Sequence, residues 1–376
     1  MRLPVADADS ALHMHRLALL STSEFVSALF DDFSRARHEV LVECYIVVDD
    51  ELGRALGDAL AHAAARGVAA RLLYDPLGSK KASKRFFREL RARGVEVRAW
   101  RTILSIPGIR HLAPRDHSRT VVVDRVAYTG GAAFAREWLP WDRGGEGWRD
   151  ACVRIEGPAV EDLRDLFLRR WHESHDSRAA HDLDTNGRYP DLRVVADTPD
   201  RQSPLYEAHR VAFAGARRRI WMANSYFAPP RRMLDALAQA AARRVDVRVI
   251  LPAVSDLPVL KLAALHRVRQ WLHAGIRVFE YRPAMFHSKY AVVDDDRCTI
   301  GTFNYNSASV GLANEVNLLV HEPTFVSRVA SMFEEDLAAS GEVTVRSMAR
   351  RSNLARGLDA IANAGVGFVD FVWGPR

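Results

Sequence analysis

Apolar runs alternate along the chain with stretches in which apolar residues recur every three or four positions. In the first half, Val40–Val48, Val68–Tyr74 and Val95–Trp100 have the length and composition of buried strands. The intervening segments Leu52–Ala65 and Phe86–Arg93 have helical periodicity and predict amphipathic helices. This order of elements predicts an α/β fold, in which a mixed, mostly parallel sheet is flanked by helices.

The second half repeats this order of elements. The corresponding strands and helices are predicted at Ile220–Phe227, Met233–Ala242, Val245–Leu251, Leu262–Ala274 and Ile276–Tyr281. An internal repeat of this length, in a chain of 376 residues, predicts two similar lobes.

A polar stretch without periodicity, Glu173–Arg188, predicts the linker between the lobes. We therefore assign residues 1–175 to an N-terminal lobe, 190–345 to a C-terminal lobe and 346–376 to a tail of amphipathic character. No segment approaches the roughly 18 consecutive apolar residues of a membrane span, so any membrane contact is expected to be peripheral.

Each half ends on the same short pattern: a histidine, a base two positions later and an aspartate seven positions later. The two copies are His117, Arg119 and Asp124 in the first half, and His287, Lys289 and Asp294 in the second. A histidine and a base two apart on a strand point to the same side, because side chains alternate. The aspartates fall on the other side, so we predict that they are structural and cap the strand-to-turn junction. Two facing pairs of this kind would be suited to phosphoryl transfer.

Charge narrows the class of partner only in part. A formal net charge of +6 and a pI near 9.4 indicate an anionic partner, which leaves nucleic acid, an acidic membrane or a phosphorylated substrate open. Three cysteines, Cys44, Cys152 and Cys298, fit a reducing compartment rather than a disulfide framework.

The double motif with its glycine-rich tails resembles the phospholipase D superfamily. Finer matches resemble its bacterial cardiolipin synthase branch, in a form without the N-terminal membrane helices of many relatives. These matches are Tyr128–Gly131, Trp148–Asp150, Arg154–Pro158, Ile250–Pro252 with Ser255 and Asp256, and Asn314–Leu318. The resemblance extends from about residue 20 to 335 and implies two α/β/α lobes related by a pseudo-twofold axis, with the active site at their interface.

The resemblance also implies a ping-pong reaction through a phosphohistidine, with no metal or other cofactor. His117 is assigned as nucleophile and His287 as general acid and base, although these two roles are interchangeable. Arg119, Lys289 and Asn304 are expected to hold the non-bridging phosphate oxygens. Further substrate contacts are expected from three residues of the glycine-rich tails: Gly131, Gly301 and Thr302.

A catalytic imidazole needs an acceptor that fixes its other nitrogen. The resemblance implies that Glu315, 28 residues after His287, orients that histidine, and that its counterpart Asp150, 33 residues after His117, does the same for His117. The first motif departs from the family pattern in Arg119, where relatives have Lys, and in Ala133, where they usually have Asn. A weakly active, lipid-binding relative therefore stays open.

Two segments are candidates for membrane contact. Ile103–Ile109 is apolar with basic margins and directly precedes the first motif, so we expect it to dip into the headgroup region. The tail offers a second apolar series, for which packing on its own lobe is an equal alternative. Its members are Leu354, Leu358, Ile361, Phe368, Phe371 and Trp373.

These patterns favour a phosphatidyltransferase of the cardiolipin synthase type. It would transfer a phosphatidyl group from phosphatidylglycerol, an anionic phospholipid, to an alcohol acceptor lipid on the cytoplasmic face of the cell membrane. The alternative is a phosphodiesterase, either a phospholipase D or a nuclease. Nucleic acid is the less favoured partner, because the apolar segment before His117 does not suit a polar groove. The sequence leaves the acceptor and the oligomeric state open, and it is compatible with a monomer.

Overall fold

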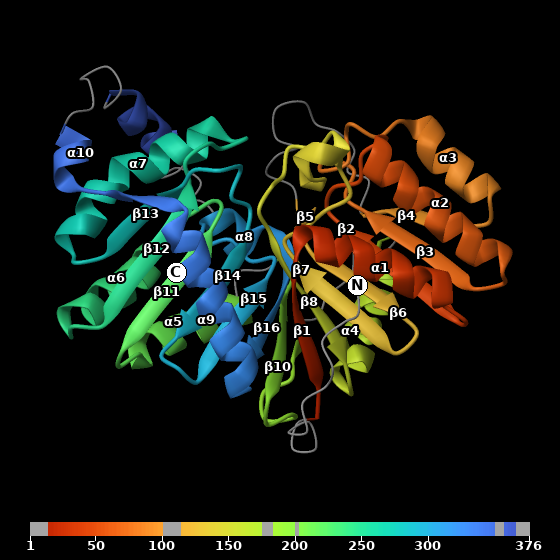
Figure 1. The fold of residues 1–376 in the computed structure, drawn as a ribbon, viewed down its shortest axis with the longest axis horizontal. Helices are drawn as coiled ribbons and strands as arrows, with labels where there is room; N and C mark the ends of the chain where they lie inside the picture. Colours follow the sequence, from red (N-terminus) through yellow and green to blue (C-terminus); the bar gives the residue numbers. More distant parts are fainter. Residues whose placement is uncertain (1–13, 101–113, 175–182, 200–202, 350–356, 366–376) are drawn as a thin grey trace.

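The computed structural model describes residues 14–100, 114–174, 183–199, 203–349 and 357–365. It contains two α/β lobes that lie side by side (Figure 1), with the N-terminal lobe at the right and the C-terminal lobe at the left. Each lobe is built on one mixed β-sheet flanked by helices, as the alternating pattern of the sequence predicts.

The N-terminal lobe has a seven-stranded sheet in the order β1-β8-β7-β6-β2-β3-β4. Its strands are β1 (Arg16–Ser21), β2 (Glu39–Cys44), β3 (Ala69–Tyr74), β4 (Glu96–Ala99), β6 (Arg119–Val123), β7 (Val126–Gly130) and β8 (Ala151–Glu156). Its helices are α1 (Thr22–Arg35), α2 (Glu51–Ala65), α3 (Lys84–Ala92) and α4 (Ala159–Glu173), with short 3₁₀ turns η2 (Arg136–Trp138) and η3 (Trp141–Arg143).

The C-terminal lobe has a ten-stranded sheet with the main order β17-β13-β12-β11-β14-β15-β16-β10-β9, to which β5 adds by pairing with β16. Its strands are β5 (Arg115–Asp116), β9 (Leu183–Asp184), β10 (Leu192–Asp197), β11 (Arg219–Asn224), β12 (Asp246–Pro252), β13 (Arg277–Tyr281), β14 (Lys289–Val293), β15 (Arg297–Gly301), β16 (Ala313–Val320) and β17 (Ser340–Val343). Its helices are α5 (Pro204–Gly215), α6 (Arg231–Ala242), α7 (Pro258–His273), α8 (Ser307–Gly311), α9 (Pro323–Ala338) and α10 (Val345–Ala349).

The pairing of the strands corrects one expectation. In the N-terminal sheet only β2–β3 and β3–β4 are parallel, whereas the other four pairs are antiparallel. The C-terminal lobe repeats this arrangement, with parallel β11–β12 and β12–β13 beside antiparallel β11–β14 and β14–β15. Helical crossovers make the outer strands parallel, but each motif strand continues into a tight hairpin, which can only be antiparallel. The sheets are mixed as predicted, without being mostly parallel.

The two motif aspartates are structural, as the sequence predicts. Asp124 has φ 50° at the β6–β7 turn, and its carboxylate accepts from the main-chain amides of Arg37, His38 and Glu39 at 2.9–3.0 Å. Asp294 has φ 54° and accepts in the same way from the amides of residues 217–219. Each carboxylate thus fastens the motif hairpin to the loop that enters the neighbouring strand, far from the histidine.

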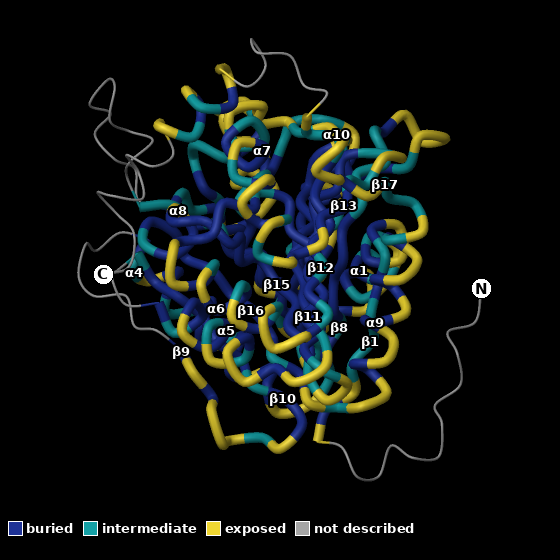
Figure 2. Tube along the Cα trace, turned by 90° about the vertical axis from the view of Figure 1, so that its left-hand side faces the viewer, coloured by how far each residue is buried: buried dark blue, intermediate teal, exposed yellow. Residues whose placement is uncertain are grey.

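The hydrophobic core explains why the lobes do not separate. One buried cluster contains residues of both sheets and of α4 and α9, such as Val122 and Phe167 from the first half with Ile300 and Phe333 from the second. Each lobe has one further cluster, which lies under its outer helices. Buried segments accordingly fill the centre of the molecule (Figure 2). A continuous core between the lobes fixes their relative position, because closely packed side chains permit little sliding.

Among the helices that the structure describes, none combines the length and the apolar character needed to cross a bilayer.

Candidate active site

Each motif histidine is held by main-chain hydrogen bonds to the opposite lobe. The amide of His117 donates to the carbonyl of Asn314 at 3.1 Å, directly after β5 has paired with β16. The amide of His287 donates to the carbonyl of Arg149 at 2.8 Å, beside a bridge between Arg149 and Phe286. In both cases the partner residue directly precedes a carboxylate residue, so each histidine is placed beside the acid of the other lobe.

The carboxylate assignments of the sequence are therefore wrong in their pairing. Nδ1 of His117 lies 3.0 Å and 3.1 Å from the two carboxylate oxygens of Glu315. Nδ1 of His287 lies 2.7 Å from Oδ2 of Asp150. Both acids do contact a catalytic candidate, but the partners are exchanged between the lobes, because β5 and Phe286 cross the interface before the histidines begin.

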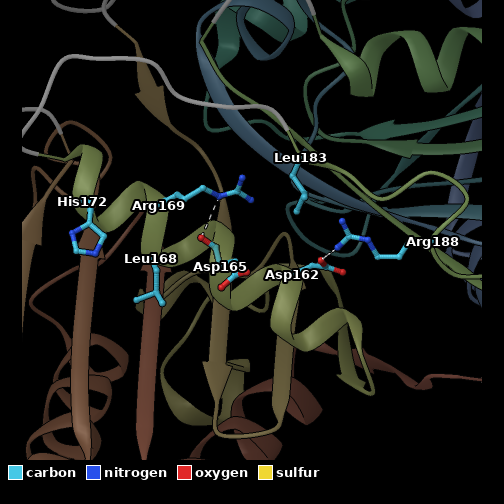
Figure 3. Close-up of a pocket in the computed structure, with 7 residues that line it drawn as sticks. All are labelled: Asp162, Asp165, Leu168, Arg169, His172, Leu183 and Arg188. Carbon is cyan, nitrogen blue, oxygen red and sulfur yellow. Dashed lines mark hydrogen bonds and ion pairs between the residues drawn. The ribbon is translucent and has the colours of Figure 1, made fainter.

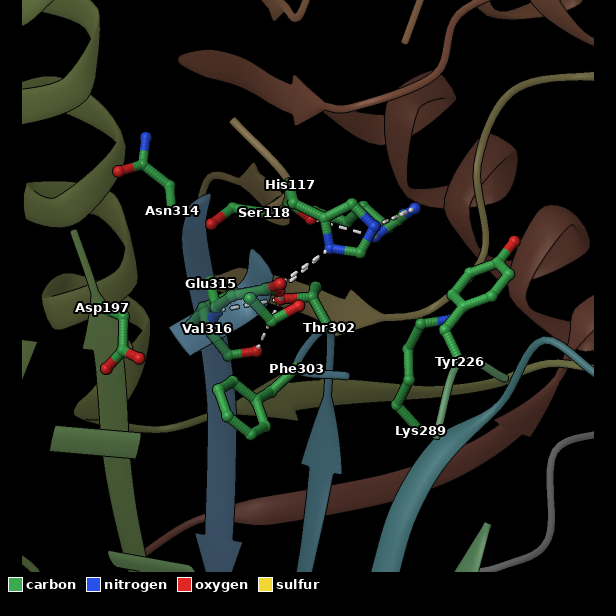
Figure 4. A network of polar contacts seen from close by, with 12 residues as sticks. His117, Ser118, Asp197, Tyr226, Lys289, Thr302, Phe303, Asn314, Glu315 and Val316 are labelled. Carbon is green, nitrogen blue, oxygen red and sulfur yellow. Dashed lines mark hydrogen bonds and ion pairs between the residues drawn. The ribbon is translucent and has the colours of Figure 1, made fainter. Parts of the chain in front are cut away.

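The His117 half-site is built to favour uncharged groups. Burial, together with the positive charges of Arg119 and Lys289, lowers the pKa of His117 well below its usual value. Burial raises the pKa of Glu315 to about 8. The hydroxyl of Thr302 donates to Glu315 at 2.5 Å and accepts from the amide of Val316, which fixes the carboxyl group (Figure 4).

The His287 half-site differs, because its carboxylate remains ionised. Burial opposes the charge of Asp150, but His287 and Lys289 outweigh it and the pKa of Asp150 is lowered. Trp138 Nε1 donates to the same carboxylate oxygen at 3.0 Å. Burial and the charge of Lys289 lower the pKa of His287 to about 4 against the opposing effect of Asp150. The ring of His287 packs edge-on to Trp138, at 5.2 Å between centroids.

The two bases lie against their own histidines. Arg119 Nη1 donates to the carbonyl of His117 at 2.9 Å and lies 3.4 Å from its Nε2. Lys289 Nζ lies 3.1 Å from Nε2 of His287 and donates to Ser225 Oγ at 2.8 Å. Burial lowers the pKa of Lys289 to about 7. Both groups are buried, so an anionic ligand would relieve charge that the free protein holds at a cost.

Both half-sites lie at the interface between the lobes, because each histidine contacts the carboxylate of the opposite lobe. The charge of Lys289, from the C-terminal lobe, lowers the pKa of His117, and Arg119, from the N-terminal lobe, lowers that of His287. Both effects agree with a single buried site at this interface. The fold thus brings together the histidines, bases and carboxylates that the sequence selected.

The glycines of the two tails leave room for the close packing of the main chain and carboxylates behind the site. A Cβ on Gly131 would lie 2.0 Å from Oδ1 of Asp150, and one on Gly301 would lie 2.2 Å from the carbonyl of Val316. The hydroxyl of Thr302 is likewise engaged by protein groups. These contacts give the three residues a supporting position behind the carboxylates, and their contact with substrate stays a prediction.

Asn304 is buried, and its Oδ1 has no hydrogen-bond partner among the described residues. Its contact with a phosphate oxygen stays a prediction.

Two tyrosines complete the site, and sequence reasoning missed them. Tyr45 packs on His117 with ring centroids 4.9 Å apart, and Tyr226 lies 5.9 Å from the ring of His287. The hydroxyl of Tyr226 donates to Asp256 at 2.7 Å. Tyr45 follows the end of β2 by one residue and Tyr226 follows the end of the corresponding strand β11 by two. A tyrosine just beyond the same strand of each half is the signal that could have identified them.

A cavity of about 390 Å³ lies elsewhere, along α4 (Figure 3). It contains none of the predicted site residues and is lined by Asp162, Asp165, Leu168, Arg169, His172, Leu183 and Arg188. The apolar segment Ile103–Ile109 and most of the tail series lie outside the described residues. Within the tail, Leu358 and Ile361 are exposed on a helix at 357–365, while Asn363 of that helix accepts from Arg267 of α7 at 2.5 Å.

Comparison with known proteins identifies the family of the chain. Residues 29–171 and 210–337 match the family model described as "Cardiolipin synthase, PLD-like domain". The chain is 31% identical over 345 residues to Cardiolipin synthase 2 of Bacillus anthracis, covering 89% of this chain and 66% of that protein. It is 32% identical over 316 residues to Cardiolipin synthase B of Salmonella typhimurium, covering 80% of this chain and 75% of that protein.

Among solved structures, phosphatidylserine synthase from Haemophilus influenzae Rd KW20 superposes with a TM-score of 0.74 at 15% identity, covering 96% of this chain and 95% of the other. Polyphosphate kinase from Porphyromonas gingivalis gives a TM-score of 0.59 at 14% identity, covering 95% of this chain and 53% of the other. At these identities the similarity concerns the fold alone.

The paired motifs and the two-lobed fold define a phospholipase D-like protein. The extent of the sequence match then makes the narrower assignment: the chain belongs to the cardiolipin synthase family of phospholipase D-like proteins and is a phospholipase D-type, cardiolipin synthase-like enzyme.

Proposed function

We propose that this protein transfers a phosphatidyl group from phosphatidylglycerol to the hydroxyl of an acceptor lipid, at the cytoplasmic surface of the cell membrane. The observation that carries the proposal is the pair of unlike histidine half-sites at one buried position. One histidine contacts a carboxyl group with a raised pKa, and the other contacts an ionised carboxylate. A displacement with a covalent intermediate needs such a division between nucleophile and acid.

In the first step, Nε2 of His117 attacks phosphorus and the bond from phosphorus to the glycerol oxygen breaks. The imidazolium of His287 gives its proton to that oxygen, and glycerol leaves. Arg119 and Lys289 stay beside the non-bridging oxygens throughout. The anionic substrate restores favourable surroundings for the charged forms of Lys289 and His287, whose pKa values are lowered in the free protein.

In the second step, His287 is neutral and removes the proton from the acceptor hydroxyl. The acceptor oxygen attacks phosphorus, the bond between phosphorus and nitrogen breaks, and His117 is released. With a second phosphatidylglycerol as acceptor, the products are one diphosphatidylglycerol and one glycerol. Water as acceptor gives phosphatidic acid by the same route.

The test is to incubate the purified protein with phosphatidylglycerol vesicles and, separately, with plasmid DNA. The proposal expects diphosphatidyl product and intact plasmid. Phosphatidic acid alone would indicate a phospholipase, nicked plasmid a nuclease, and vesicle binding without product a lipid-binding relative. His117→Ala and His287→Ala should each lose at least about 10³-fold of the activity, while His62→Ala, on the exposed face of α2, should lose none.

A further inference from the structure

Most of the exposed apolar side chains belong to a few neighbouring elements. Nine large apolar residues are exposed in the described part of the chain. Seven of them belong to η3, the β12–α7 connection, the first turn of α7, α10, or the helix at 357–365, and the last two elements both contact α7. These seven are Trp141, Val254, Leu257, Val259, Val345, Leu358 and Ile361, which we call the apolar face. Exposed apolar residues scattered singly would need no explanation, but their concentration on neighbouring elements does.

The apolar face adjoins the site from both lobes. On the C-terminal side, Asp256, between Val254 and Leu257, accepts from the hydroxyl of Tyr226, which packs on His287. On the N-terminal side, η3 is joined to the site through Gly147 and Trp148: a Cβ on Gly147 would lie 2.7 Å from Nε1 of Trp141. The ring of Trp148 lies 5.6 Å from that of His287. Figure 1 shows α7 and α10 together at the upper edge of the molecule.

The charge of the supporting helices indicates which partner this face meets. α7 carries Lys261, His266, Arg267 and Arg269, and α10 carries Arg346, whereas neither helix contains an acidic residue. A tryptophan and aliphatic side chains among bases suit the boundary between headgroups and acyl chains of an anionic bilayer. The other elements of the face add Arg143 and the acids Asp142, Asp256 and Asp359, so that five Lys and Arg residues stand against three acids. This excess of bases favours an anionic bilayer as the partner.

We propose that the apolar face docks on an anionic lipid bilayer and presents the mouth of the site to the membrane. This inference rests on the proposed function, since a phosphatidyl donor lies in a bilayer. It adds the surface by which the donor is reached, and it assigns that surface to described residues outside the segment Ile103–Ile109.

The test compares wild type with Val259→Asp/Ile361→Asp, two positions that are 59% and 73% exposed. Val211→Asp is the matched control, because Val211 is 57% exposed on α5, on another part of the surface. Sedimentation with vesicles of phosphatidylglycerol and phosphatidylcholine measures binding, and hydrolysis of bis(p-nitrophenyl) phosphate in solution measures the catalytic groups.

We expect the double variant to bind at least tenfold more weakly, the control to bind like wild type, and all three to hydrolyse the soluble ester equally. Wild-type binding should also weaken with added salt. The proposal is overturned if wild type does not bind, if the double variant binds like wild type, or if Val211→Asp weakens binding equally. Vesicle binding through this face in a protein that cleaves no phosphodiester would sustain the docking proposal and refute the proposed function.

A second, independent observation concerns two buried groups behind His117. The side chains of Asp116 and Asn314 are both 0% exposed and face each other across the β5–β16 pairing, where Asn314 Nδ2 donates to Asp116 Oδ1 at 3.0 Å. Among the described residues, the second oxygen of Asp116 and the amide oxygen of Asn314 have no hydrogen-bond partner. Two acceptors cannot satisfy each other unless one of them carries a proton.

We infer that Asp116 is a neutral carboxylic acid whose Oδ2–H donates to Oδ1 of Asn314, which closes a cyclic acid–amide pair between the lobes. Burial, and then the acidic neighbours Glu43 and Asp75, raise the pKa of Asp116 against the opposing charge of Arg170. Asp116 directly precedes His117, and Asn314 directly precedes Glu315. The cyclic pair is thus a positioning device that holds the histidine against its carboxyl partner.

Two variants test this pair. Asp116→Asn can still form a cyclic pair with Asn314, so we expect kcat/KM within about threefold of wild type, whereas Asp116→Ala should lose at least tenfold. Infrared spectroscopy should show the C=O band of a protonated carboxyl group in wild type that is missing in Asp116→Asn. If Asp116 is instead an anion that balances the nearby arginines, Asp116→Asn loses activity as Asp116→Ala does and no band disappears, which refutes the pair.

Discussion

The exchange of carboxylates between the lobes predicts which chemical step each acid supports. Asp150→Asn keeps the volume beside Gly131 but removes the charge that lies 2.7 Å from Nδ1 of His287. An uncharged amide cannot stabilise the imidazolium that protonates the leaving group. Comparable replacements behind a catalytic histidine cost about 10²- to 10⁴-fold, and the complete burial of Asp150 favours the upper part of this range.

The assay compares two phosphodiesters in a rapid-quench measurement of phosphoenzyme formation. An alkyl ester needs protonation of its leaving oxygen, whereas a p-nitrophenyl ester leaves without an acid. Asp150→Asn should slow phosphoenzyme formation from the alkyl ester by about 10²-fold or more, and that from the p-nitrophenyl ester by less than tenfold. Glu315→Gln should slow both, because Glu315 orients the nucleophile His117.

The reasoning is refuted if Asp150→Asn slows both esters equally, or if Glu315→Gln spares the p-nitrophenyl ester. The pairing within each half that the sequence suggested predicts this reversed result. One pair of variants therefore distinguishes carboxylates that act on the histidine of the opposite lobe from carboxylates that act on the histidine of their own half. Wild type provides the reference for the intrinsic reactivity of the two esters.

Three further outcomes follow from the same geometry. Because the pKa of Glu315 is raised to about 8, the folded state binds an extra proton between about pH 4.5 and 8, and the free energy of unfolding falls as pH rises through this window. Glu315→Gln should lose this dependence. In urea denaturation, its free energy of unfolding relative to wild type should therefore rise by more than about 1 kcal/mol between pH 5 and pH 9. Because the pKa of Lys289 is lowered to about 7, binding of inorganic phosphate at pH 8 should take up protons, which calorimetry in buffers of different ionisation enthalpy detects, and equal heats in all buffers would contradict it. Gly131→Ala should displace Asp150 and lose about 10²-fold of activity, whereas Gly67→Ala, in an open turn with φ 85°, should affect stability without a comparable loss.

Most strands and helices of the fold could be predicted from local sequence patterns. The strands and helices around residues 40–100 and 220–281 begin and end within a few residues of their predicted positions, because apolar runs and helical periodicity report on burial directly. The same periodicity placed the histidine and the base of each motif on one side of a strand and Asp124 and Asp294 on the other. What this reasoning missed is the hairpin after each motif strand, which makes most pairs antiparallel.

The chemical groups of the site could be identified from the amino-acid sequence: two histidines, their bases and two carboxylates, in a chain that repeats its own architecture. Which of these groups meet follows from the folded arrangement of the two lobes. Spacing along a strand fixes the side to which a residue points, because that depends on neighbouring dihedral angles alone. Whether His117 meets Asp150 or Glu315 depends on β5 pairing with a strand almost 200 residues away. That pairing is a property of how two sheets pack on one core, which no local pattern encodes.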